Sequence, residues 1–543
     1  MEDERRSKMK ILRKNKIIFY SILIIWIFAG TLIFNYSIGH AQNHSDTDDL
    51  YKYLKLFRDT MYMVKQNYVE ELKIQDLFEY AVNGMLNDVD PHTNFMKPED
   101  FEDFQTSTKG EFGGLGITID KQGDYITVVS PIEGTPAYKM GIIAGDKIVK
   151  VDGANVVGIS TDDVIKKMRG DKGTKVVITI SRPGVNNPLD FEIIRDIIKI
   201  KSIPYAFKLD NGIGYVRIRQ FNANTTQELR QSIDNLEKEG IRGLLIDLRF
   251  NPGGLLNEAV DTVNEFIGPN KLVVSTKGRL DYYNQNYNTR FNRMRTGYPV
   301  IVLVNEASAS ASEIFAGSLQ DWDKGLVVGK TTFGKGSVQQ LFPLSEGYGI
   351  KITISKYYIK SGRCIHKDIN DKILKGKEVT ADEKKMIEKD INEHIYKTVN
   401  GRTVYGGGGI TPDIEIEQDK LTELEMEIRR LNLFFEYSID YYTKNKQSIT
   451  EDFVASDALI QDFLSFGKNK GLKYESSTLD SSYAFIRNSL TSSIIDKKFG
   501  EIAGYKAGLA IDRQLMDAIS IFDKYPTLDK MFEYAKTVQT TER

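Results

Sequence analysis

A serine-rich turn is the part of this 543-residue chain with the clearest potential for nucleophilic chemistry. Ser308, Ser310 and Ser312 follow an apolar run over Val300–Val304, which we expect to be a strand, and Glu313 is typical of a first helical turn. A serine at a strand-to-helix turn is exposed, and the N–H groups of a helix N-terminus can stabilise an oxyanion. Serine is also a favoured helix cap, and this segment by itself favours a cap over a nucleophile.

A glycine-rich stretch further along the chain contains Lys335, a candidate general base. The run Gly329–Gly336 almost matches the phosphate-binding pattern GxxxxGK[ST], but Gly336 replaces the hydroxyl that would bind magnesium, so the pattern does not favour nucleotide binding. A serine nucleophile needs a base. Desolvation can lower the pKa of a lysine from ~10.4 toward ~7–8, where it can serve as that base. A solvated surface lysine is the ordinary alternative.

A third stretch, Asp247–Gly254, joins an expected buried strand to a Pro-Gly-Gly turn. Glycines at such a turn allow backbone N–H groups to approach a ligand closely. Taken alone, the stretch favours an ordinary turn.

Together these stretches resemble the carboxyl-terminal processing peptidases, also called tail-specific proteases. The resemblance implies a serine endopeptidase in which Ser310 is the nucleophile, Lys335 is the general base and Gln339 orients the lysine. It also implies an oxyanion hole built from the backbone N–H groups of Gly254 and Ala311. The matching motifs occur in the family's order: DPHT (Asp90–Thr93), GGLGI (Gly113–Ile117), DLRFNPGG (Asp247–Gly254), SASASE (Ser308–Glu313), TTFGKGSVQ (Thr331–Gln339) and GRTVYGGGGITPD (Gly401–Asp413).

Short β-branched runs separated by glycines precede this core and look like a PDZ domain. The GLGI loop would bind a chain terminus through its N–H groups, and the peptide would add as a strand beside a helix expected over Thr161–Met168. A small β domain that only spaces its neighbours is the alternative. The residues implied in peptide binding are Gly114, Leu115, Gly116, Ile117, Val164 and Met168.

The fold class that follows is an α+β multidomain chain, with a serine-protease core whose sheet is of the ClpP and crotonase type. From Gly212 onward strands alternate with helices, which predicts a largely parallel αβ sheet. The expected domains are a signal or membrane anchor (1–40), a helical region (50–108), the PDZ domain (109–185), the peptidase core (200–416, with an insertion near 367–397) and a helical C-terminal extension (417–543).

The N-terminus predicts export to the cell envelope. Met1–Lys16 carries seven basic and three acidic residues, and Ile17–Tyr36 follows as 20 residues without a charge. Such a run can cross ~30 Å of hydrocarbon, and its basic flank should remain in the cytoplasm. We therefore expect the rest of the chain on the periplasmic side. The segment is either a retained anchor or a cleaved signal, for which Gly39–Ala41 offers a cleavage site.

The composition of the chain limits the kinds of partner and cofactor that we expect. The 73 basic and 75 acidic residues nearly cancel, which argues against nucleic acid. Cys364 is the single cysteine and the five histidines are scattered, so we expect no disulfide, no metal and no cofactor. The expected partners are proteins with accessible C-termini, the membrane through the N-terminal segment, and a second copy of the chain. The alternative function is a non-catalytic PDZ scaffold on a protease-like fold.

Overall fold

The computed structural model describes residues 48–182, 185–367 and 394–541. The chain divides into two compact units, residues 1–89 and 90–543. In its described part the first unit contains a helix over residues 48–67 and helix α2 (Ile74–Val89). The predicted apolar segment Ile17–Tyr36 and most of the predicted insertion lie outside the described residues. No helix of the described ranges has the length and apolar character needed to cross a bilayer.

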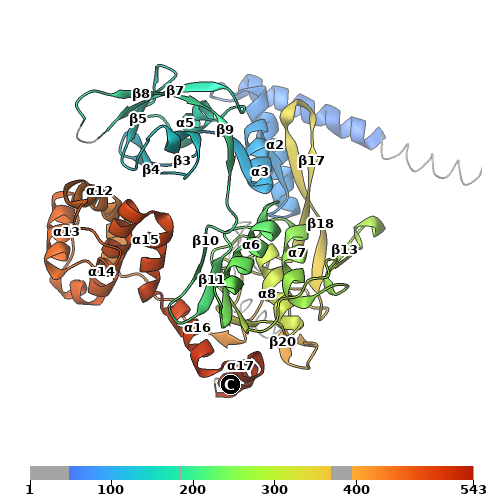
Figure 1. The fold of residues 1–543 in the computed structure, drawn as a ribbon. Helices are drawn as coiled ribbons and strands as arrows, with labels where there is room; N and C mark the ends of the chain where they lie inside the picture. The colour runs from blue at the N-terminus through green and yellow to red at the C-terminus, as the bar shows by residue number, and fades with distance from the viewer. Residues whose placement is uncertain (1–47, 183–184, 368–393, 542–543) are drawn as a thin grey trace, which may run out of the picture. The chain divides into compact units, whose positions relative to one another are not determined.

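A six-stranded sheet is the framework of the peptidase core in the second unit (Figure 1). Within the described residues, β10 is antiparallel to its neighbour and the other strands pair in parallel, which confirms the largely parallel arrangement. Strands β12 and β15 are buried at every residue, because parallel sheets are covered on both faces. The strand order is β10 (Tyr205–Lys208), β11 (Ile213–Arg217), β12 (Gly243–Asp247), β15 (Val300–Val304), β16 (Leu326–Gly329) and β21 (Ile414–Glu415).

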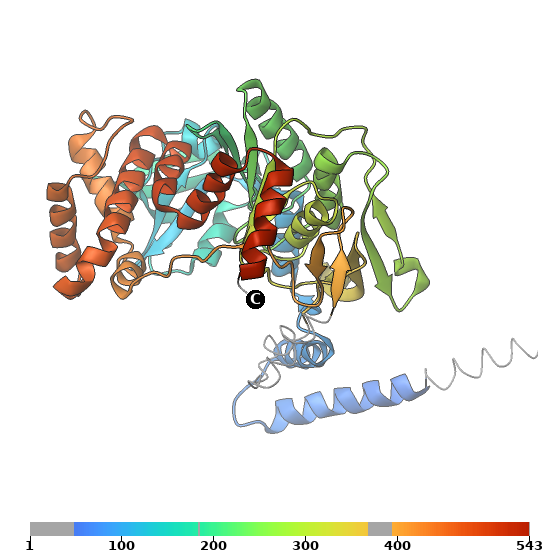
Figure 2. The same ribbon diagram turned by 90° about the horizontal axis from the view of Figure 1, so that it is seen from below.

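Helices cover both faces of this sheet (Figures 1 and 2). Alternate side chains of β12 point to opposite layers: Leu244 and Ile246 pack with α6, α7 and α8, whereas Leu245 packs with α16 and α17. Two helices of the C-terminal extension therefore complete the core, and no sequence pattern indicated this packing. These helices are α6 (Thr225–Lys238), α7 (Leu256–Ile267), α8 (Ala311–Asp321), α16 (Arg513–Lys524) and α17 (Leu528–Thr541).

A second, antiparallel sheet carries the residues that follow Lys335, and no sequence pattern indicated it. Its strands β17 and β18 pair along most of their length, with a register shift between Val338 and Gln339. Such a bulge redirects the side chains on either side of it. The elements are β1 (Asn94–Met96), β13 (Leu272–Gly278), β14 (Asn286–Asn288), β17 (Ser337–Pro343), β18 (Gly349–Ile359), the short helices η1 (Asp281–Tyr283) and η2 (Ser345–Gly347), and helix α3 (Pro98–Lys109).

The predicted PDZ segment forms a small β domain with its own apolar core. The helix expected over Thr161–Met168 is present with those bounds as α5, and the Ser160 side chain caps it by accepting the N–H of Asp163 at 3.2 Å. Strand β8 pairs with this domain's sheet although it lies beyond the predicted bounds 109–185. The remaining elements are β2 (Glu111–Gly114), β3 (Ile117–Gln122), β4 (Tyr125–Pro131), α4 (Pro136–Lys139), β5 (Lys147–Val151), β6 (Ala154–Asn155), β7 (Lys175–Ser181), β8 (Leu189–Ile194) and the following strand β9 (Asp196–Lys199).

The region after residue 417 is helical, as predicted, and four of its helices share one apolar cluster. Within that cluster the rings of Phe434 and Phe463 stack with their centroids 5.0 Å apart. The elements are α11 (Glu423–Arg430), α12 (Leu433–Asn445), α13 (Asp457–Asn469), α14 (Ser476–Phe499), α15 (Glu501–Gly508) and η3 (Leu509–Ile511), and a two-stranded sheet of β19 (Ile395–Lys397) and β20 (Thr403–Tyr405) precedes them.

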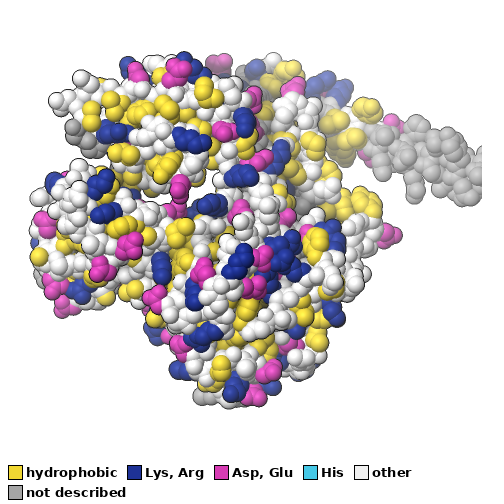
Figure 3. Space-filling view, viewed as in Figure 1, with side chains coloured by type: hydrophobic (Ala, Val, Ile, Leu, Met, Phe, Trp, Pro, Cys, Tyr) yellow, Lys and Arg dark blue, Asp and Glu magenta, His cyan; other side chains and the backbone are white. Residues whose placement is uncertain are grey.

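Charged side chains of both signs are interspersed on the surface. On the face seen in Figure 3, Lys and Arg side chains lie among Asp and Glu side chains. This mixture agrees with a formal net charge of −2 for the whole chain.

Candidate active site

The serine-rich turn joins β15 to α8, and its three serines have different surroundings. Ser308 and Ser312 are fully buried, and their hydroxyls donate to the carbonyl oxygens of Leu248 (2.8 Å) and Asn251 (3.0 Å). Ser310 is half-buried, directly precedes α8 and has a φ of 54°. A non-glycine residue at such a φ is strained and persists only where its surroundings enforce it. Of the three serines, Ser310 is the one that the turn leaves accessible.

The Glu313 carboxylate links the Ser310 turn to the loop that contains Lys335. It is fully buried and accepts the backbone N–H groups of Ser310 (2.8 Å) and Lys335 (2.9 Å). The N–H of Gly334 (2.7 Å) and the hydroxyl of Thr332 (2.6 Å) also donate to it. Burial raises the pKa of Glu313, and these hydrogen bonds oppose that rise. Sequence reasoning missed this role, although Ser-x-x-Glu is the capping-box pattern.

The Tyr357 hydroxyl makes a second link between the same two residues. Its oxygen lies 2.6 Å from the carbonyl oxygen of Lys335 and 3.2 Å from that of Ser310. Burial raises the pKa of Tyr357 well above its ordinary value, so the hydroxyl stays protonated and donates. The backbones of Ser310 and Lys335 are therefore held together at both their N–H groups and their carbonyl groups.

The Pro-Gly-Gly turn lies against this arrangement. A Cβ atom on Gly253 would be 2.8 Å from both the Ala311 nitrogen and the Ser310 Cβ. Gly254 has a φ of 145°, and a Cβ there would meet the Phe221 carbonyl oxygen at 2.0 Å, so this position requires glycine. In the described chain, no backbone acceptor is found for the N–H groups of Gly254 and Ala311. Both donors are therefore available to a ligand.

Buried charges anchor the strand end that leads into this turn. Asp247 is fully buried and pairs with Arg217 (2.9 Å) and Arg249 (2.8 Å). Burial would raise the pKa of Asp247, but the two guanidinium groups outweigh it and lower this pKa to about 2. Arg249 also pairs with Asp512 at 2.6 Å, at the start of α16. The C-terminal extension thus helps to fix the loop beside Ser310.

The Lys335 side chain is largely removed from solvent. Burial lowers the pKa of its ammonium group to about 8, the nearby Lys351 adds to this shift, and Glu313 and Asp90 oppose it. A lysine with such a pKa has an appreciable neutral fraction near pH 7–8 and can accept a proton. The sequence had left a solvated surface lysine open as the alternative.

Gln339 lies on β17 immediately after the register shift. Its Nε2 donates to the hydroxyl oxygens of Ser337 (2.9 Å) and Thr353 (3.3 Å). These are the hydrogen bonds of its side chain seen among the described residues, and none of them reaches Lys335. The orienting role of Gln339 stays a prediction.

The predicted carboxylate-binding loop connects β2 to β3. The carbonyl oxygens of Leu115 and Gly116 accept the N–H groups of Ala137 (3.0 Å) and Ile132 (2.8 Å). Their own N–H groups have no backbone acceptor in the part of the chain that the structure describes. A Cβ on Gly116 would lie 2.3 Å from the Thr135 side chain, so the tight turn has no room for a side chain at this position.

The other predicted peptide-binding residues lie around this loop. Gly114 ends β2 and Ile117 begins β3. Val164 is fully buried and Met168 is 7% exposed, and both belong to the apolar core of the β domain. Their contact with a peptide stays a prediction.

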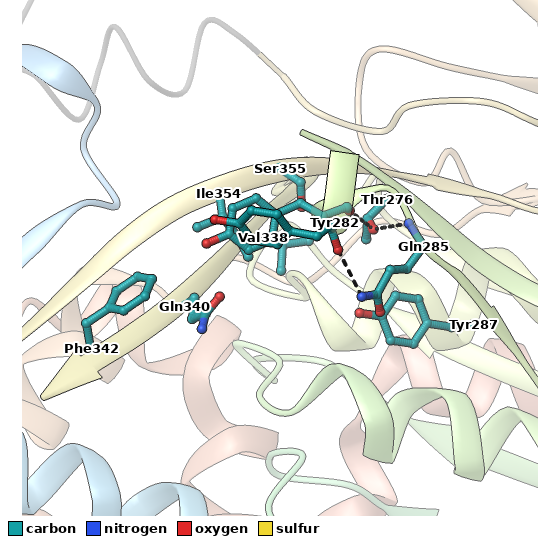
Figure 4. Close-up of a pocket in the computed structure, with 10 residues that line it drawn as sticks. Thr276, Tyr282, Gln285, Tyr287, Val338, Gln340, Phe342, Ile354 and Ser355 are labelled. Atoms are coloured by element: carbon teal, nitrogen blue, oxygen red, sulfur yellow. Dashed lines mark hydrogen bonds between the residues drawn. The ribbon is translucent and has the colours of Figure 1, made fainter. Parts of the chain in front are cut away.

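A cavity of about 460 Å³ lies beside β17 (Figure 4). Val338, Gln340 and Phe342 contribute to its wall, and Gln340 and Phe342 alternate with Gln339 along the strand, so they face away from Gln339. Its lining residues do not include Ser310, Lys335 or Gln339. The other residues of its wall are Thr276, Tyr282, Tyr283, Gln285, Tyr287, Ile354 and Ser355.

Comparisons with known proteins identify the family of the chain and one of its domains. The model of peptidase family S41 matches residues 212–374, a PDZ domain model matches residues 127–182, and a family of unknown function matches residues 425–500. The carboxy-terminal-processing protease of Bartonella bacilliformis is 40% identical over 348 residues, which are 63% of this chain and 80% of that protein. The carboxy-terminal processing protease CtpA of Bacillus subtilis is 34% identical over 357 residues, which are 64% of this chain and 75% of that protein.

Two solved structures are also similar to parts of the chain. The photosystem II D1 C-terminal processing protease is 29% identical with a TM-score of 0.33, covering 57% of this chain and 90% of that one. The PDZ domain of a carboxy-terminal protease from Vibrio cholerae, solved with a peptide, is 30% identical with a TM-score of 0.16, covering 16% of this chain and 98% of that one.

The accessible serine at a strand-to-helix turn, together with the matched domains, defines a serine-type peptidase that carries a PDZ domain. More particularly, the chain belongs to the carboxy-terminal processing proteases of peptidase family S41.

Proposed function

We propose that the protein is an endopeptidase that cleaves protein substrates through an acyl-enzyme formed on Ser310, with Lys335 as the general base. The observation that carries this proposal is the double link between the two residues, through Glu313 at their N–H groups and Tyr357 at their carbonyl groups. Burial of the competing Ser308 and Ser312 hydroxyls, each already donating to a carbonyl, supports the choice of Ser310.

In this mechanism the Ser310 Oγ bonds to the scissile carbonyl carbon while its proton passes to Lys335 Nζ. The N–H groups of Gly254 and Ala311 stabilise the oxyanion that forms. The Lys335 ammonium then gives its proton to the leaving amine as the C–N bond breaks. Water attacks the remaining ester, Lys335 takes a proton from that water and returns it to Ser310 Oγ, and Gln339 orients the amine throughout. The pKa of Lys335, about 8, suits both directions of transfer.

Substrates are recognised at their C-termini by the PDZ domain. The free N–H groups of Leu115 and Gly116 support this part of the proposal, because adjacent backbone donors bind a terminal carboxylate. The bound peptide would then extend beside α5.

We place this activity in the cell envelope, on the periplasmic side. This part rests on the basic flank and the uncharged run Ile17–Tyr36, which would export the chain and either anchor it or be cleaved. Assembly with a second copy of the chain is part of the same proposal.

The proposed dyad is tested by cleavage of an unfolded protein substrate with Ser310→Ala and Lys335→Ala. Each variant should lose activity by at least about 10³-fold while its thermal unfolding stays cooperative. Lys330→Ala is the matched control. The Lys330 side chain is partly buried and pairs with the exposed Glu415 (2.7 Å), and it has no part in the proposed dyad, so this variant should keep its activity. Full activity of purified Ser310→Ala protein would exclude the dyad. A parent protein that binds C-terminal peptides but cleaves nothing would favour the scaffold alternative.

A further inference from the structure

The Asp90 carboxylate is the centre of a hydrogen-bond network beside Lys335. It accepts the N–H groups of His92 (2.7 Å) and Thr93 (2.9 Å) and the hydroxyl of Thr93 (2.6 Å), which together close a local turn. A fourth donor comes from β18, where the Thr353 hydroxyl donates at 3.1 Å. A local turn does not need this fourth bond. Asp90 therefore does more than shape the turn that contains it.

The charge of Asp90 fixes the direction of the next hydrogen bond. Burial would raise the pKa of Asp90, but the hydrogen bonds from Thr93, His92 and Thr353 outweigh it and lower this pKa. An ionised carboxylate only accepts hydrogen bonds, so Thr353 must use its single hydroxyl proton toward Asp90. The lone pairs of the Thr353 oxygen are then left for a donor, which is Nε2 of Gln339 at 3.3 Å.

The Gln339 amide is thereby held in one of its two possible orientations. Both hydrogens of Nε2 are used, one toward Ser337 and one toward Thr353. No hydrogen bond to its Oε1 is seen within the described residues, so this oxygen keeps its capacity to accept one. An ammonium group has three donors and no acceptor, so Oε1 is the end of the amide that can bind the protonated base. In the reversed orientation, the Nε2 hydrogens of Gln339 would face the ammonium hydrogens of Lys335, and two donors cannot form a hydrogen bond.

We propose that Asp90, acting through Thr353, is a positioning residue that fixes the Gln339 amide with its Oε1 available to Lys335. This inference rests on the proposed function. It adds a role for the Asp90–Thr93 segment, which is far from the dyad in sequence. Asp90 does not touch the substrate or the reacting atoms in this account. It acts by disfavouring the reversed orientation of the Gln339 amide.

The test compares Thr353→Val, which removes the hydroxyl at nearly constant shape, with Thr353→Ser, which retains it. We expect Thr353→Val to lower kcat about 10-fold with little change in KM, because it removes the hydrogen bond that holds the Gln339 amide. Thr353→Ser keeps that hydroxyl, so its kcat should stay within about 2-fold of the parent value. Both variants are also made in a Gln339→Leu background. There Thr353→Val should cause no further loss, since Thr353 acts through Gln339. A purely structural role would instead give additive losses and overturn the inference, as would equal kcat values for Thr353→Val and the parent.

A pH profile provides a readout that misfolding cannot imitate. The charged groups that act on Lys335 are Lys351, Glu313 and Asp90, and Thr353→Val leaves all three in place. Loss of the Oε1 acceptor destabilises the ammonium form of Lys335, so the midpoint of kcat/KM should move to lower pH in Thr353→Val and not in Thr353→Ser. An unchanged midpoint would contradict the inference.

Failure of the proposed peptidase function can be distinguished from failure of the positioning role of Asp90. If the parent protein cleaves no substrate, the reaction assignment is wrong, but the positioning of Lys335 can still be measured in Ser310→Ala protein. Acylation of Lys335 by a small reactive ester, followed by mass spectrometry across pH, reports its titration. The same downward shift in Thr353→Val would support the network, and an identical titration in both Thr353 variants would overturn it.

Discussion

Two helices of this protein begin with the same pattern, a hydroxyl residue followed three positions later by glutamate. At the start of α11, the Glu425 carboxylate accepts the N–H of Thr422 at 3.0 Å, and the Thr422 hydroxyl accepts the N–H of Glu425 at 3.2 Å. At the start of α8, Glu313 likewise accepts the N–H of Ser310 at 2.8 Å. In both places the glutamate of the pattern accepts the N–H of the hydroxyl residue, which is one half of a capping box.

The two caps differ in their backbone and in their further contacts. Thr422 has an ordinary extended conformation with a φ of −70°, whereas Ser310 has a φ of 54°. Glu313 also accepts donors from the loop around Lys335, which gives it a role outside its own helix. The comparison teaches that a local motif identifies a helix start, while strain and long-range contacts separate a cap from a candidate nucleophile.

The largest contrast is expected between Glu313→Gln and Glu425→Gln. In Glu313→Gln an amide NH₂ faces buried donors, and each donor left unpaired costs about 1–3 kcal/mol. We expect a loss of stability of about 2–4 kcal/mol and at least a 100-fold loss of kcat/KM, because the links between the Ser310 and Lys335 loops fail. Glu425→Gln should cost less than about 1 kcal/mol and keep full activity. Chemical denaturation and peptide-cleavage kinetics measure both, and similar losses of activity in the two variants would remove the distinction between the caps.

A smaller effect is expected from Lys351, whose positive charge acts on the pKa of Lys335. Lys335 must be neutral to act as a base, so kcat/KM should rise with pH through the pKa of about 8 and fall away below it. The positive charge of Lys351 lowers the pKa of Lys335, so Lys351→Met should raise that pKa and move the midpoint of the profile upward by about half a pH unit. At pH 7 the activity should therefore fall about threefold. Lys330→Met removes a positive charge that is paired with Glu415 and is not among the groups that shift the pKa of Lys335, so it should leave the midpoint in place. A downward shift in Lys351→Met would contradict the electrostatic account.

Local pattern was enough to predict the elements whose residues are close in sequence. The apolar run Val300–Val304 is a strand with those bounds, and α5 begins and ends where its periodicity and cap indicated. Such elements are encoded by spacings of two or about four residues, which a single sequence displays directly.

Contacts between distant segments could not be predicted in this way. Thr353 and Asp90 are 263 residues apart, and neither residue belongs to a periodic pattern that indicates the other. The packing of α16 and α17 on the central sheet is of the same kind, since an amphipathic helix does not specify which surface it covers. The choice of Ser310 among three serines came from family resemblance, and burial of Ser308 and Ser312 now supplies a physical argument for it.

The central claim is that Lys335 activates Ser310, and covalent labelling tests it most directly. The parent protein is treated with a fluorophosphonate over a range of pH, and the labelled residue is identified by mass spectrometry. We predict labelling of Ser310 with a midpoint near the Lys335 pKa of about 8, and its loss in Lys335→Met. Labelling of Ser308 or Ser312 instead, or equal labelling of Ser310 with and without Lys335, would contradict this account.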